Sequence, residues 1–138
     1  MRKLTIITML LMMFISGCSS NFEPELTRID VQKINEDGTN DGEERLIADK
    51  KVLQSIEHAF SKIEWSPKTK AEMARKEDVI VTFFIQEEKN MPERLYEYRI
   101  WFEGDTATIT SEKENEGYGR LTDKTEVQAL ESKLLQGE

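Results

Sequence analysis

The sequence has one cysteine, Cys18, and one histidine, His58, in 138 residues. A single cysteine excludes an intramolecular disulfide, so the fold depends on noncovalent packing. A single histidine excludes a zinc centre with several histidine ligands. No serine has glycines two residues before and two residues after it, and no glycine-rich phosphate loop occurs. We therefore expect neither a metal centre nor a cofactor.

An excess of basic residues is also lacking. The chain has 19 Lys and Arg against 27 Asp and Glu, and its net charge is −8. Nucleic-acid binding needs a basic surface that neutralises phosphates, so we expect no nucleic-acid partner. The acidity alone indicates only a well-solvated surface.

The only long apolar run is at the N-terminus. Arg2 and Lys3 precede residues 4–15, which are apolar except for Thr5 and Thr8. A membrane-spanning helix needs about 20 apolar residues, so this run is too short for a stable span. A charged start, a short apolar stretch and small residues after it are typical of a secretory signal peptide, which we predict over residues 1–17.

The end of this run, Ile15-Ser16-Gly17-Cys18, resembles the bacterial lipobox. The resemblance implies that Cys18 receives a diacylglyceryl group and becomes the first residue of the mature chain. Two acyl chains suffice for stable membrane attachment, whereas one binds only marginally. The expected partner of Cys18 is thus the cell membrane, on its extracytoplasmic side, with residues 18–25 as a lipidated tether. The alternative is an ordinary secretory signal with a chance or structural cysteine.

Residues 26–138 form one domain by length. The pattern predicts strands at 26–34, 79–86, 94–103 and 106–111, short strands at 45–48 and 117–121, and helices at 49–63 and after Asp123. Asp49 and Asp123 are suitable N-caps. Residues 68–78 could form one or two helical turns. We predict an α+β fold with two layers, a mainly antiparallel sheet of four to five strands and two helices on one face.

Three stretches, "ADKKVLQSIEHAFSKIEW", "EMARKEDVIVTFFIQEEKNMPERLYEYRIWF" and "EGYGRL", resemble the small YhfM-like lipoproteins of bacilli. The resemblance covers most of the expected mature chain. It implies a lipoprotein with an α+β fold, and it implies no activity and no functional residues.

The acidic segment 35–44 has a partial resemblance to a calcium loop. With Asp37 at the first position, Thr39, Asp41 and Gly42 fit, but Ala48 falls where a bidentate Glu is required. We predict a solvated hairpin turn, with weak calcium binding as the alternative.

Side chains alternate between the two faces of a strand. The helices can cover only one face, and the other would carry a candidate binding face of Phe84, Glu97, Arg99 and Trp101. Trp and Arg are enriched at binding hot spots. The alternative is that the tether, the 68–78 segment or the last strand covers this face and buries Trp101.

Two functions of different class follow. The first is a membrane-anchored, noncatalytic binding or interaction module with a protein partner in the cell envelope. The second is an envelope hydrolase that uses a pair of carboxylates. We predict the first, because the sequence contains no serine nucleophile motif flanked by glycines and only one histidine that could act as a base.

Overall fold

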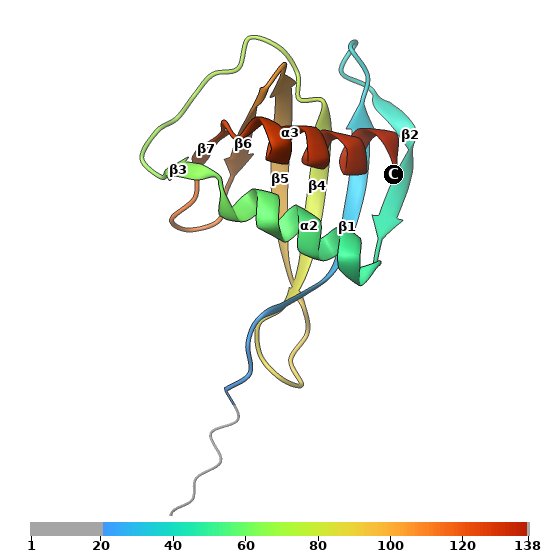
Figure 1. Cartoon of the computed structure of the whole chain (residues 1–138), viewed down its shortest axis with the longest axis vertical. Helices are drawn as coiled ribbons and strands as arrows, with labels where there is room; N and C mark the ends of the chain where they lie inside the picture. Colours follow the sequence, from blue (N-terminus) through green and yellow to red (C-terminus); the bar gives the residue numbers. More distant parts are fainter. Residues whose placement is uncertain (1–20, 138) are drawn as a thin grey trace, which may run out of the picture.

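The structure is a computed structural model that describes residues 21–137. Its main feature is one curled antiparallel sheet of seven strands in the order β2-β1-β4-β5-β6-β7-β3 (Figure 1). The strands are β1 (Glu25–Ile34), β2 (Asn40–Ile47), β3 (Glu64–Ser66), β4 (Val79–Gln86), β5 (Arg94–Glu103), β6 (Thr106–Ser111) and β7 (Tyr118–Leu121).

The helices α2 (Lys50–Ser61) and α3 (Lys124–Glu131) lie next to each other across one side of the sheet, and η2 (Ser132–Gln136) continues α3 (Figure 1). Both predicted caps are confirmed. The Asp49 side chain accepts from the backbone N–H groups of the first turn of α2, and Asp123 does the same for α3. These acceptors satisfy donors that a helix leaves unpaired at its start.

The core lies between the helices and the sheet. From α2 it includes Leu53, Ile56 and Ala59, and from α3 Val127 and Leu130. The sheet contributes alternate residues of its central strands, as the two-residue period predicts: Val79, Val81, Phe83, Tyr98, Ile100, Phe102, Ala107 and Ile109. An aromatic cluster joins Phe60 of α2 to Phe83 and Tyr98, with ring centroids 4.7 and 5.0 Å away.

The predicted sheet of four to five strands is wrong, because the sheet has seven. The three-residue strand β3 was not predicted, since only Trp65 in it is apolar and such a stretch has no readable period. Strand β2 is longer than predicted because it is an edge strand with a polar, exposed sequence, NDGEERLI, that resembles a loop. The 68–78 segment contains no helical turn.

The N-terminal predictions fall on residues that the structure does not describe. Residues 1–17 and Cys18 lie outside the range 21–137. Within that range, no helix has the length and apolar character needed to cross a membrane.

The packing of α2 on the sheet can be tested at Ile56, whose side chain is 1% exposed. Ile56→Ala should lower the free energy of unfolding by about 2–5 kcal/mol, because it removes buried methyl groups and leaves a cavity. Gln54→Ala, at an exposed position of the same helix, should change it by less than about 0.5 kcal/mol. Equal effects in urea unfolding would show that this side of α2 is not buried.

Candidate functional site on the outer face of the sheet

We call the side of the sheet opposite α2 and α3 the outer face. In β5 the predicted division of side chains is confirmed: Tyr98, Ile100 and Phe102 belong to the core, and Glu97 and Arg99 are exposed on the other side. The outer face has no helix over it in the part of the chain that the structure describes.

A segment without helix or strand, residues 67–78, crosses part of the outer face, and we call it the strap. It joins β3 to β4. The indole Nε1 of Trp101 donates a hydrogen bond of 2.9 Å to the carbonyl of Arg75, and the Trp101 side chain is only 5% exposed. Trp101 is therefore not an exposed contact residue. The alternative in which the 68–78 segment buries it is the arrangement observed.

The strap is fixed by further bonds near Trp101. Arg75 pairs with Asp78 at 2.7 Å and donates to the Phe102 carbonyl at 2.9 Å. The hydrogen bonds to Asp78 raise the pKa of Arg75. The Asp78 carboxylate also accepts from the Phe102 backbone N–H at 2.7 Å. One end of the strap is thus bound to the C-terminal half of β5.

Arg99 lies between two carboxylates. Its guanidinium contacts Glu77 of the strap at 2.9 Å and Glu97 of β5 at 3.1 Å. Glu77 is 8% exposed, so its charge depends on Arg99 for compensation. These are the two carboxylates that the strap and β5 bring together at this site, and Arg99 already binds both.

Phe84, the fourth predicted residue, is placed differently. The Arg28 guanidinium lies 3.7 Å from the centre of the Phe84 ring and also pairs with Asp30 at 2.9 Å. A cation over an aromatic ring covers its face. The structure therefore brings Glu97, Arg99 and Trp101 together in the lining of one groove. Phe84 lies under Arg28 and does not line this groove.

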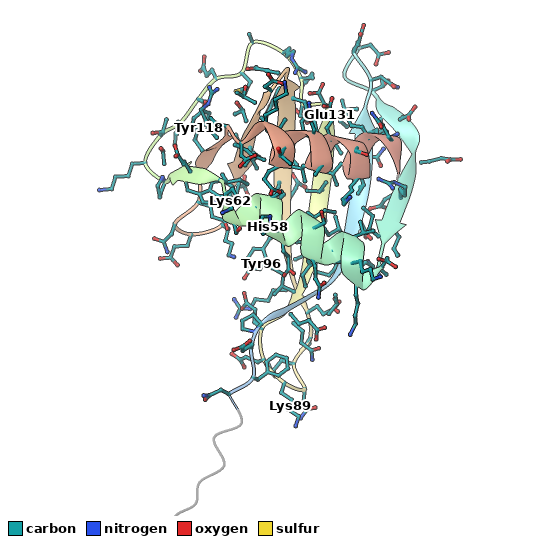
Figure 2. The ribbon with its side chains drawn as sticks, viewed as in Figure 1. His58, Lys62, Lys89, Tyr96, Tyr118 and Glu131 are labelled. Carbon is teal, nitrogen blue, oxygen red and sulfur yellow. The ribbon has the colours of Figure 1, made fainter. Side chains whose placement is uncertain are left out.

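A broad groove of about 1550 Å³ runs along the outer face between the strap, β5 and the β6–β7 loop (residues 112–117). Pockets for small molecules usually have about 300–1,000 Å³, so this groove is larger than a usual small-molecule pocket. Figure 2 labels two lining residues, Tyr96 of β5 and Tyr118 of β7. A side chain at Gly117 would come within 3.0 Å of the Pro67 carbonyl, so the loop and the start of the strap are in close contact.

The groove differs in charge from the rest of the chain. Six of its lining residues are Lys or Arg and four are Glu, whereas acids outnumber bases 27 to 19 in the sequence. Sequence reasoning did not find the strap lysines Lys70 and Lys76 as part of this site, because nothing in the sequence shows that the strap folds back over β5.

Leu95 is a further lining residue that was not among the predicted ones. It is 58% exposed on the outer face of β5. A signal for it existed: β5 has ten residues and β6 only six, so part of β5 extends beyond its neighbour.

In the acidic turn between β1 and β2, the Asp37 side chain binds Thr39. Its carboxylate accepts hydrogen bonds from the Thr39 hydroxyl at 2.6 Å and from the Thr39 backbone N–H at 2.9 Å, and these bonds lower the pKa of Asp37. Within residues 21–137, no three acidic, His or Cys side chains gather as a metal site. The turn stays a predicted solvated hairpin turn.

Comparisons of the chain with protein-family models, with curated proteins and with solved structures give no match.

The burial of Trp101 under the strap predicts a difference between two positions of β5. Trp101→Ala should lower the free energy of unfolding by about 3–5 kcal/mol, as expected for a buried aromatic side chain. Leu95→Ala, on the same face of the same strand, should change it by less than about 0.5 kcal/mol because Leu95 is 58% exposed. A small loss for Trp101→Ala in chemical denaturation would mean that the strap does not cover the indole.

Proposed function

We propose that this chain is a lipoprotein, anchored through Cys18 to the extracytoplasmic side of the cell membrane, whose outer face binds a protein of the cell envelope. In this proposal residues 1–17 are a signal peptide and residues 18–25 are the tether. The protein acts by binding and not by catalysis.

The groove is the observation that carries this proposal. Its volume of about 1550 Å³ exceeds what a small substrate needs. It lies on the side of the sheet without helices, and it combines the exposed Leu95 with charged lining residues. Interfaces between proteins commonly combine apolar and charged residues.

The state of the groove carboxylates favours binding over hydrolysis. A pair of catalytic carboxyl groups must flank the scissile bond of a substrate. Glu77 and Glu97 instead both contact Arg99, at 2.9 and 3.1 Å.

The anchor is supported by the sequence Ile15-Ser16-Gly17-Cys18 and by the resemblance to YhfM-like lipoproteins. The described domain begins close to that site, since β1 starts at Glu25. Residues 18–25 can extend over at most about 29 Å. A partner of the groove would therefore be sought among proteins at or near the membrane surface.

Crosslinking in intact cells tests both parts of the proposal. A photo-crosslinking amino acid replaces Glu97, which is exposed in the groove, or Gln54, which is exposed on α2. Position 97 should give a defined adduct with an envelope protein in the membrane fraction, identified by mass spectrometry. Position 54 should not give this adduct, because α2 covers the opposite side of the sheet.

The same experiment with Cys18→Ala tests the anchor. The variant should leave the membrane fraction or accumulate uncleaved, and the adduct at position 97 should decrease. Membrane-bound, processed protein in this variant would contradict the lipid anchor. Identical adducts at positions 97 and 54 would contradict binding through the outer face.

A further inference from the structure

The two neighbours of β5 pair with different parts of it. Strand β4 pairs with Arg94–Ile100, and β6 pairs with Tyr98–Glu103. Residues 94–97 therefore have a strand on one side only. Beyond Ser111 the chain leaves β6 and turns through the β6–β7 loop, so β5 has an open edge inside a sheet of seven strands.

The directions of the backbone groups identify which residues form this edge. Ile100 accepts from the Asp78 N–H at 2.9 Å, and the Phe102 N–H donates to Asp78 Oδ2 at 2.7 Å, so even-numbered residues of β5 direct their backbone groups toward β4. Backbone groups alternate in direction along an antiparallel strand. The N–H and C=O of Leu95 therefore point to the side where β6 has ended.

The open edge belongs to the groove. Its residues, Arg94, Leu95, Tyr96 and Glu97, all line the groove together with Glu112 and Lys113 of the β6–β7 loop. The Leu95 side chain is 58% exposed. Tyr96 has its ring under the Lys113 ammonium group, 4.6 Å from the ring centre. A strand placed against this edge would meet Leu95 on one face and Tyr96 with Lys113 on the other.

The charge of the strap indicates the chemistry of such a strand. Within residues 21–137, the strap lysines Lys70 and Lys76 take part in no ion pair. The only strap acid in the groove lining is Glu77, which Arg99 already holds. Glu112 and Glu114 are also unpaired, but they lie on the β6–β7 loop. The unbalanced positive charge is thus on the strap side of the groove.

We propose that the partner enters the groove as an extended acidic segment that adds a strand to the open edge of β5 at Leu95. Its backbone pairs with the Leu95 N–H and C=O, and its carboxylates lie against Lys70 and Lys76. Strand addition of this kind obtains affinity from backbone hydrogen bonds and specificity from alternate side chains. The proposal rests on the function proposed above and names the class of partner.

The test uses the protein purified in detergent and a display library of random linear peptides as the probe. Selected peptides should be acidic and should bind with an affinity that decreases with salt. N-methylation of alternate residues in a selected peptide should abolish binding, because it removes the donors that pair with a strand edge.

Variants of the protein identify the edge. Leu95→Pro removes the backbone N–H at the open side but no bond to β4, and proline is tolerated where a strand N–H faces solvent. It should weaken peptide binding about three- to tenfold relative to Leu95→Thr, which keeps the N–H. Lys70→Glu with Lys76→Glu should also weaken binding, whereas Lys51→Glu on α2 should not. Melting temperatures of all variants show whether the fold is retained.

Several results would overturn the inference. These are the selection of no peptides or of basic peptides, and equal binding by Leu95→Pro and Leu95→Thr. A dimer in sedimentation that Leu95→Pro dissociates would assign the edge to a second copy of this chain. If the crosslinking at position 97 succeeds and the neighbour binds independently of Leu95, the proposed function is retained and strand addition is rejected. If Leu95→Pro unfolds the protein, strand addition is tested by the N-methylated peptide alone, and unchanged binding of that peptide rejects it.

Discussion

The hydrogen bond from the Trp101 indole to the Arg75 carbonyl determines how the outer face is arranged. Two short helices cover one side of the sheet, and a tryptophan on the other side would expose a large apolar surface. The strap covers this surface by lying over Trp101. There the backbone carbonyl of Arg75 accepts a hydrogen bond of 2.9 Å from the indole N–H. Because the strap is fixed near Trp101, it covers the C-terminal half of β5 and leaves the N-terminal half accessible.

The open half of β5 differs in composition and surroundings from the edge strand β2. Strand β2 is the edge strand beside β1; half of the residues in its sequence NDGEERLI are charged, and most of them are exposed. Charged edges resist pairing with other chains. The open edge of β5 is different, because its exposed Leu95 lies in a groove that the strap and the β6–β7 loop also line.

The sequence predicted the parts of the fold that depend on local patterns. Alternation in β4 and β5 correctly separated Val81 and Tyr98 from Glu97 and Arg99, and Asp49 correctly marked the start of α2. It offered the cover of Trp101 by the 68–78 segment only as one of three alternatives and did not predict strand β3, because both are determined by contacts between distant residues. Gly119 illustrates this: a side chain there would come within 2.5 Å of Ile63, so its place in β7 depends on packing against residues over fifty positions away. For the site, Trp101 and Arg99 were predicted as neighbours, but the role of Trp101 as an anchor for the strap requires the structure.

The central claim is that β5 has a partner strand on its β6 side only from Tyr98 onward. Amide hydrogen exchange followed by NMR tests this most directly, because exchange protection reports hydrogen bonding at each residue. We expect fast exchange at Leu95 and slow exchange at Arg99, whose backbone groups have the same direction but face β6. We also expect slow exchange at Tyr96, which is paired with Phe83 of β4. Equally strong protection of Leu95, Tyr96 and Arg99 would contradict the open edge.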